Sequence, residues 1–299
     1  MQRKIIQQSA TSMGISLPSK WVKKWNLAKG NIVNIDEVNG ILEIKPVDFR
    51  QPEKKAEIDT KIYGNLTARK FDNLSKRGYD EIKVLYSAEK ELEPIKDLLL
   101  HELTMFEIVK KEKDCIIARA ISEINKEELD RIVNRFVFLL IENINKTRIY
   151  LQKEEKNILN DILETENAIN RLYQTCMRAL NRQPPEEQSY MRYTFIWVLE
   201  KLGDDFKFFA KSNPVNISKE TKIIINKVLD NLKLVIDIFF KYDTNKAYTF
   251  YNQRKKIVNE CIILLRKKTN VNDHLLVHFA LSMNEKGLYL LGLLLGLSD

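Results

Sequence analysis

Three carboxylates in the second half of the chain are the residues best suited to chemistry. Glu200 and Asp204 are four residues apart, and Glu166 and Asn170 show the same spacing in an earlier helical stretch. Residues four apart lie on one face of a helix, and here that face is otherwise apolar or aromatic. Buried carboxylates need a cation, a hydrogen-bond donor or a proton. Because oxygen atoms from adjacent helices can ligate a divalent metal, iron or zinc, Glu166, Glu200 and Asp204 are candidate metal ligands.

Basic side chains in the same helices offer an alternative to a metal ion. Lys201, Lys207 and Arg171 lie close in sequence to the three carboxylates. An ion pair with one of these side chains, or contact with solvent, would compensate a carboxylate equally well. The spacing fits both explanations, and both stay open here.

The other reactive residue types do not form an active site. His274 and His278 have the spacing of zinc ligands, but Asp273 is the only third ligand nearby, so core or surface histidines explain them better. Cys115, Cys176 and Cys261 lack the spacing of a zinc ribbon or a disulfide framework. The sequence has no nucleophile–base arrangement and no Glu-x-x-His pairs of a di-iron bundle. We therefore expect neither a metal-dependent hydrolase nor an oxidase, and no enzyme.

Basic side chains near the N-terminus point to contact with a polyanion. They are Arg3, Lys4, Lys20, Lys23 and Lys24. The net charge of +8 favours the same kind of partner, although the excess is spread along the chain. We expect these five residues to contact the phosphates or bases of double-stranded DNA, with an affinity that falls steeply as salt rises.

Long helices must position the carboxylates. From about Lys126 to the end, apolar residues recur at helical spacing. Two sets of three helices, separated near Pro214, suggest a duplicated three-helix bundle over residues 126–213 and 218–299. Pro184-Pro185 ends the second helix. The helices after the first are expected over residues 154–181, 186–211, 218–242, 245–268 and 273–297.

The stretch before the helices has a mixed pattern. Residues 46–55 contain two prolines and no periodicity, so we interpret them as a linker. Residues 56–123 are expected to form a small α/β connecting segment. Its expected elements are a helix over 58–74, a strand over 81–87, a helix over 89–101 and a hairpin of 106–110 with 115–121.

The basic N-terminal residues belong to a small fold that cannot stand alone. We expect strands at Ile5-Ile6 and over residues 14–17, a short helix that starts at Pro18, and strands over 32–36 and 41–45 joined around Asn39-Gly40. So few residues bury too little surface for an isolated monomer. Two interleaved copies would solve this problem, so we expect a homodimer with its basic residues duplicated about a two-fold axis.

This block resembles the AbrB/MazE (SpoVT-AbrB) swapped-hairpin family. The matching residues are Arg3-Lys4, Leu17-Pro18 and the turn Leu27-Ala28-Lys29-Gly30-Asn31-Ile32. The resemblance implies an obligate dimer, a swapped-hairpin β-barrel over residues 1–48, and DNA binding by the N-terminal strands and the adjoining loop. A dimerisation module that touches no nucleic acid is the alternative.

The stretch Glu200-Lys201-Leu202-Gly203-Asp204 resembles the Leu-Glu-Arg-Ile-Gly-Asp signature of PhoU proteins. The spacing back to Glu166 and Asn170 is similar as well, although Asn170 replaces an acidic residue. The resemblance implies duplicated three-helix bundles, metal clusters bound through paired E/D-x-x-x-D motifs, and regulation of phosphate uptake together with phosphate transporters and sensor kinases. Proteins that join both parts are found among archaea.

The second half of the helical region departs from this motif. Its corresponding positions are Asn284, Leu288, Asn252 and Lys256. Lysine and leucine do not replace carboxylate ligands, so we expect a metal ion, if any, only in the first bundle.

Together these patterns predict a mainly α protein with an AbrB-like N-terminal barrel, a small α/β segment and duplicated PhoU-like bundles. The expected function is DNA-binding transcriptional regulation of phosphate uptake and phosphate homeostasis. The alternative is an adaptor that restrains a phosphate ABC transporter ATPase or a sensor kinase, with an N-terminal domain that only dimerises. We expect a cytoplasmic protein without membrane insertion, because there is no signal-peptide pattern and the apolar run Leu288–Leu297 is about half a span.

Overall fold

Residues Met1–Pro52 and Glu53–Asp299 form two separate units in the computed structural model, which is mainly helical. It describes residues 2–38, 40–47, 52–122, 124–183, 188–267 and 270–297. The mainly α class expected from the sequence is confirmed. Asn39, Pro184 and Pro185, expected at a turn and at a helix end, lie outside the described residues.

The first unit contains two hairpins and a short helix. Strands β1 (Ile5–Gln7) and β2 (Met13–Ile15) pair antiparallel, as do β3 (Val33–Val38) and β4 (Ile41–Pro46). Helix α1 (Ser19–Lys24) follows Pro18. Among the described residues these strands form two separate two-stranded sheets rather than the closed barrel expected from the sequence. Pro46 is the only buried residue in the described part of this unit, so one copy has almost no core.

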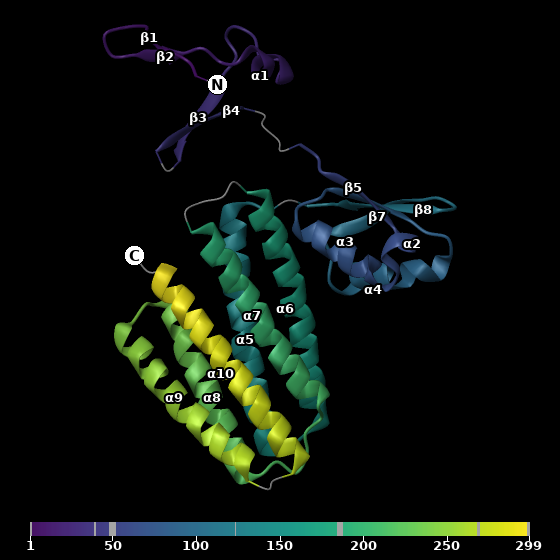
Figure 1. Ribbon diagram of the computed structural model, residues 1–299, viewed down its shortest axis with the longest axis vertical. Coiled ribbons are helices and arrows are strands. Elements are labelled where there is room, and N and C mark those ends of the chain that lie inside the picture. The colour runs from purple at the N-terminus through teal and green to yellow at the C-terminus, as the bar shows by residue number, and fades with distance from the viewer. Residues whose placement is uncertain are drawn as a thin grey trace. The chain divides into compact units, whose positions relative to one another are not determined.

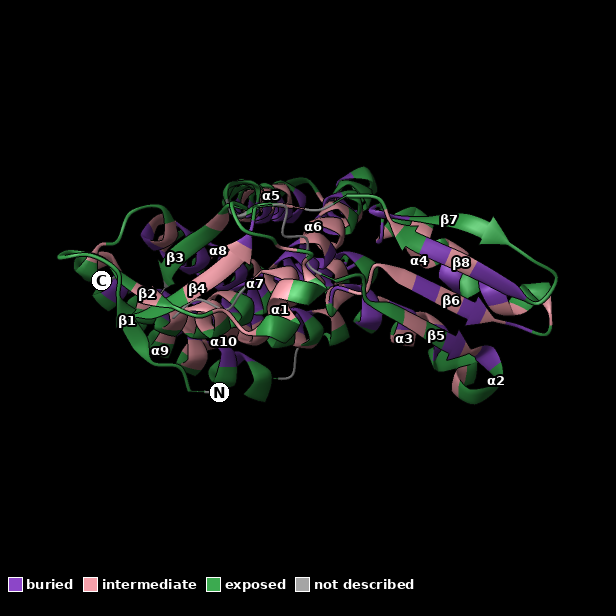
Figure 2. Ribbon diagram, turned by 90° about the horizontal axis from the view of Figure 1, so that it is seen from above, coloured by how far each residue is buried: buried purple, intermediate pink, exposed green. Residues whose placement is uncertain are grey.

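The second unit begins with a four-stranded sheet in the order β5-β6-β8-β7. Strands β5 (Lys55–Asp59) and β6 (Glu81–Leu85) are parallel, and β7 (Phe106–Lys111) and β8 (Cys115–Ala120) continue the sheet antiparallel. In Figure 2, buried residues alternate along β6, as expected for a strand with one covered face. The hairpin predicted for β7 and β8 is confirmed.

The helix predicted over 58–74 is wrong at its start. Residues 55–59 form β5, and Ile58 is fully buried in the sheet. The Asp59 side chain then caps α2 (Thr60–Tyr63), Gly64 leaves the helical region with φ +49°, and a single 3-10 turn (Gly64–Leu66) leads into α3 (Thr67–Lys76). Another 3-10 turn (Glu89–Leu92) precedes α4 (Glu93–His101), which has Pro94 in its first turn.

The rest of the second unit is the predicted series of long helices. They are α5 (Lys126–Lys153), α6 (Lys156–Arg182), α7 (Ser189–Lys211), α8 (Lys219–Phe240), α9 (Thr244–Arg266) and α10 (Val271–Leu297). Asn125 and Glu128 form a capping box at the start of α5, and Ser218 and Asp243 cap α8 and α9. These caps satisfy backbone N–H groups that a helix start leaves unpaired.

The long helices run side by side as one bundle (Figure 1). Helices α5 to α7 pack on one another, α8 to α10 do the same, and α7 packs along α10. One continuous apolar core runs through both sets. The buried carboxylate of Asp205 in α7 accepts hydrogen bonds from Ser282 and Lys286 in α10, at 3.0 and 2.8 Å. In the described part of the chain, no helix has the length and apolarity to cross a membrane.

Arg178 of α6 joins the α/β segment to the bundle. Its side chain is 3% exposed. Its guanidinium donates to Asp80 Oδ1 at 2.6 Å and to the Tyr79 carbonyl oxygen at 2.6 Å, and it lies over the Phe106 ring. Arg182, one turn later, lies 3.2 Å from the other oxygen of Asp80. This buried ion pair links the two parts, and removal of one partner from such a pair is strongly destabilising.

Candidate functional site

The two acidic helix faces meet because α6 and α7 approach closely at Gly203. A Cβ atom built on Gly203 would lie 3.0 Å from Cγ2 of Ile169 in α6, a tight contact that would require the Ile169 side chain to shift. Gly203 belongs to the Glu200–Asp204 motif, and Ile169 lies between Glu166 and Asn170. The motif glycine therefore permits the two helices to approach closely beside the sequence-predicted carboxylates.

Lysine side chains compensate these carboxylates. Glu166 is 1% exposed and forms an ion pair with Lys207 of α7. The Asn170 amide donates to the same carboxylate at 2.8 Å. Asn170, which interrupts the acidic pattern, is thus a hydrogen-bond donor to the acid one turn away.

A second lysine forms ion pairs with the two carboxylates of α7. Lys201 Nζ lies 2.9 Å from Glu200 Oε2 and 2.9 Å from Asp204 Oδ2. Lys207 Nζ is also 3.2 Å from Asp204 Oδ1. The three carboxylates and two ammonium groups form one network, which we call the acid–lysine network.

Burial and pairing move the pKa values of the network in different directions. Burial raises the pKa of Glu166 and of Glu200, against the hydrogen bonds from Lys207 and Lys201. Burial also acts to raise the pKa of Asp204, but Lys201 and Lys207 outweigh it, so this pKa lies below its ordinary value. Burial acts to lower the pKa of Lys201 and Lys207, and their carboxylate partners outweigh it and raise both.

The network does not fit a metal ion as it stands. A metal site needs oxygen ligands that converge on one point, whereas Lys207 lies between Glu166 and Asp204 and Lys201 between Glu200 and Asp204. Among the described residues, the three carboxylates do not come together as a group of closely spaced ligand atoms. Of the explanations open from the sequence, the structure favours compensation by lysine.

The corresponding place in the second half contains buried amides. Asn284 is 1% exposed and accepts a hydrogen bond from Asn231 at 3.3 Å. Its own amide donates to the Arg254 carbonyl oxygen at 3.3 Å. Gly287 again permits close packing, because an added Cβ would lie 3.1 Å from Leu232 and Phe250. Close packing at a glycine thus occurs in both halves, while the buried polar groups beside Gly287 are the amides of Asn231 and Asn284.

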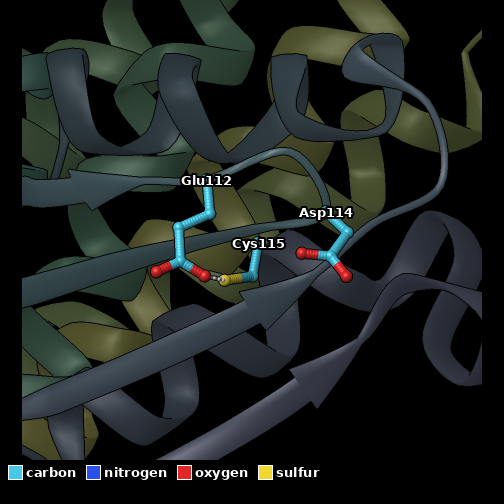
Figure 3. A group of neighbouring side chains, drawn as sticks. All are labelled: Glu112, Asp114 and Cys115. Carbon is cyan, nitrogen blue, oxygen red and sulfur yellow. Dashed lines mark hydrogen bonds between the residues drawn. The ribbon is translucent and has the colours of Figure 1, made fainter.

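A different set of ligand atoms gathers at the β7–β8 turn. Glu112, Asp114 and Cys115 have ligand atoms within 4.8 Å of one another, and Figure 3 shows the Glu112 carboxylate facing the Cys115 sulfur. Glu112 is paired with Lys110, and burial raises the pKa of the Cys115 thiol. Metals bind the thiolate rather than the thiol, so these contacts give no support to a metal site.

The remaining cysteines and histidines show no reactive arrangement. Burial raises the pKa of the Cys176 thiol to about 12 and that of Cys261 to about 11. All three cysteines are buried and free. His274 Nε2 lies 3.3 Å from the Lys267 carbonyl oxygen, and His278 is exposed.

The predicted DNA-contacting residues are all exposed in the first unit. Arg3 and Lys4 precede β1, while Lys20, Lys23 and Lys24 lie on or beside the outer face of α1. None of the five forms an ion pair with another described residue; Lys24 lies over the Trp25 ring. Their charges are therefore available to an external anion.

Sequence reasoning missed a cleft beside the acid–lysine network. The cleft has a volume of about 880 Å³ and lies between α3 and α4 on one side and α6 and α7 on the other. Tyr173 and Gln174 of α6 line it, together with Asp72 and Lys76 of α3. The signal in the sequence was the polar Gln174 inside an apolar helix stretch, but the α3 residues that line the same cleft, Asp72 and Lys76, are about 100 positions away. Comparisons with models of known protein families, with curated proteins and with solved structures found no match.

Proposed function

We propose that the protein is a homodimeric, DNA-binding transcriptional regulator of phosphate uptake that acts in the cytoplasm. The helical region, which we interpret as duplicated PhoU-like three-helix bundles, is its sensory or partner-binding part. The observation that carries the proposal is the state of the first unit, which exposes both its apolar and its basic side chains. The phosphate link rests on the resemblance of the Glu200–Asp204 motif to PhoU proteins.

The exposed apolar residues of the first unit support association with a second copy of the chain. Ile5 is 72% exposed, Ile32 73%, Ile35 59% and Ile41 67%. Strands β1 and β2 are largely exposed in Figure 2. Burying such a side chain stabilises by about 1.5–3 kcal/mol, so interleaved hairpins from two chains would create the core that one chain lacks. This supports the swapped-hairpin barrel as the structure of the dimer.

The basic residues support DNA as the partner. A two-fold dimer presents two sets of Arg3, Lys4, Lys20, Lys23 and Lys24, and paired sets of this kind match the two-fold symmetry of an operator. Each phosphate contact releases counterions, so the logarithm of the affinity falls with the logarithm of the salt concentration, by about 0.9 per contact.

The test is neutralisation of the residues before β1. In the double variant Arg3→Gln and Lys4→Gln, we expect duplex affinity to fall at least tenfold, because up to roughly four phosphate contacts per dimer are lost. The salt slope should become shallower by about 1 for each contact removed. Neutralising the exposed lysines Lys219 and Lys233 of α8 is the matched control and should change neither quantity. Unchanged affinity and slope in the first variant would show that these residues do not bind DNA.

Genome-wide capture of bound DNA in phosphate-rich and phosphate-poor cells tests the physiological part. We expect enrichment upstream of phosphate transporter genes in at least one condition. Absence of enrichment in both conditions would exclude phosphate uptake as the regulated process.

An adaptor that restrains a transporter ATPase or a sensor kinase is the second candidate. It is favoured by aromatic side chains exposed along α7, where Tyr190 is 81%, Tyr193 40% and Trp197 43% exposed, because aromatic residues are enriched in protein interfaces. Capture of the ATPase or kinase by residues 53–299 fused to a coiled-coil dimer would support the adaptor. Loss of capture without the first unit would count against it.

A further inference from the structure

The cleft between the α/β segment and helices α6 and α7 is lined by residues with buried acceptors that no donor among the described residues satisfies. Gln174 is 4% exposed, lines the cleft, and its Oε1 accepts no hydrogen bond among the described residues. Asp72 Oδ1 is likewise buried without a donor, while its Oδ2 is paired with Lys76 at 2.7 Å. A buried acceptor without a donor destabilises the folded chain, because it has lost its hydrogen bonds to water. A ligand that donates hydrogen bonds would satisfy both oxygens once their side chains turn toward the cleft.

The charges around the cleft favour a positive ligand. Five carboxylates line it, and the lysines and arginines that line it number four. The carboxylates are Asp72, Asp97, Glu102, Glu200 and Asp204, and the bases are Arg69, Lys76, Lys201 and Lys207. Lys207 is also paired with Glu166 behind the wall. The lining thus has an excess of negative charge.

The aromatic side chains that line the cleft suit an organic cation. Tyr173 is 8% exposed and Trp197 43%, and both line the cleft. Aromatic faces attract ammonium groups, and Lys76 Nζ already lies 4.9 Å from the centre of the Tyr173 ring. An inorganic anion would meet Glu200 and Asp204, whereas a divalent ion would have to displace the two network lysines.

We propose that this cleft binds a small molecule that carries an ammonium group, which donates to Gln174 Oε1 and Asp72 Oδ1 and is balanced by Glu200. The ammonium belongs either to a simple amine or to an amino acid. The position of Arg69 distinguishes an amino acid from a simple amine. It lies one helical turn before Asp72, is exposed, and has no ion pair with another described residue. A carboxylate on the ligand would pair with Arg69, whereas a diamine has no group for it.

Titration calorimetry on the full chain tests the proposal directly, independently of DNA binding. The probes are 1,4-diaminobutane and 4-aminobutanoate, with magnesium chloride and inorganic phosphate as comparisons. We expect saturable binding of at least one amine. Gln174→Leu and, separately, Glu200→Gln should weaken it about tenfold or more, as loss of a charged hydrogen bond does. Arg69→Gln should weaken binding of 4-aminobutanoate alone.

The control separates a binding role from a structural one. Asn143 of α5 is fully buried and its amide has no partner among the described residues, but it does not line the cleft. Asn143→Leu should leave amine binding unchanged. Gln174→Leu should leave the thermal transition unchanged or raise it, because it removes an unsatisfied acceptor. Absence of amine binding up to about 10 mM, binding of magnesium alone, or amine binding indifferent to both cleft variants would overturn the proposal.

Discussion

The two units of this chain differ in how far their apolar side chains are buried. In the second unit the apolar faces of six long helices meet in one core, where Phe206 and Phe250 are fully buried. In the first unit Ile5, Ile32 and Ile41 are each more than 60% exposed. Removing apolar surface from water is the main source of stability for a folded segment. The difference supports our proposal that the second unit folds by itself and the first folds together with a second copy.

Removing the first unit should give the largest effect. We expect residues 53–299 to keep a cooperative thermal transition and to lose both dimerisation and DNA binding completely. Analytical ultracentrifugation, calorimetry and duplex binding measure the three quantities. A fragment that remains dimeric would show that the bundle also associates. This result would contradict the assignment of dimerisation to the first unit.

Paired truncations in the two units sharpen the comparison. Phe206→Ala should lower the free energy of unfolding by about 3–5 kcal/mol, independently of protein concentration. Ile35→Ala should cost less than about 0.5 kcal/mol in a single chain, where Ile35 is 59% exposed. In an interleaved dimer it should cost about 2–5 kcal/mol, and the unfolding midpoint should depend on protein concentration. Urea titrations at two concentrations distinguish these outcomes.

Arg178→Met tests whether the α/β segment and the bundle remain one unit. We expect a loss of about 2–3 kcal/mol, below the usual 3–5 for a broken buried pair, because Arg182 still neutralises Asp80. Hydrogen exchange should become faster in β5 and β6 while α8 to α10 are unaffected. Equal loss of protection in all helices would mean that the two parts unfold together.

The smallest effect concerns alkaline pH. The pKa values of Lys201 and Lys207 are raised above 10.5 in the folded chain. Their stabilising contribution is therefore complete below the unfolded value and is lost as pH rises through the folded value. We expect the network to lose about 1 kcal/mol above pH 10.5, because both lysines are partly exposed and screened. Lys207→Met should reduce this loss of unfolding free energy with rising pH. An unchanged loss in the variant would assign it to other groups.

The helices were predictable because their apolar spacing is local information. The placement of Glu166, Glu200 and Asp204 on facing helices followed from the same spacing, and Gly203 explains why the helices approach. Whether a metal ion or lysine side chains compensate the carboxylates depends on where the flexible ammonium groups lie. Residue spacing does not specify those positions.

The elements that sequence reasoning missed depend on distant partners. Strand β5 has five residues and pairs in parallel with β6 across an intervening helix, so its short pattern merged with the helix that follows. The Arg178–Asp80 pair joins residues 98 positions apart. The cleft combines α3 with α6 and α7 and exists only after this packing.

Asp80 connects the start of the second unit to helix α6. Besides Arg178 and Arg182, it accepts a hydrogen bond at 2.8 Å from the backbone N–H of Lys54, where the chain enters this unit. Helix α6 carries Gln174 only one turn before Arg178. One carboxylate therefore ties the first residues of this unit to the same helix that lines the cleft, and Lys54 and α6 share a single anchor.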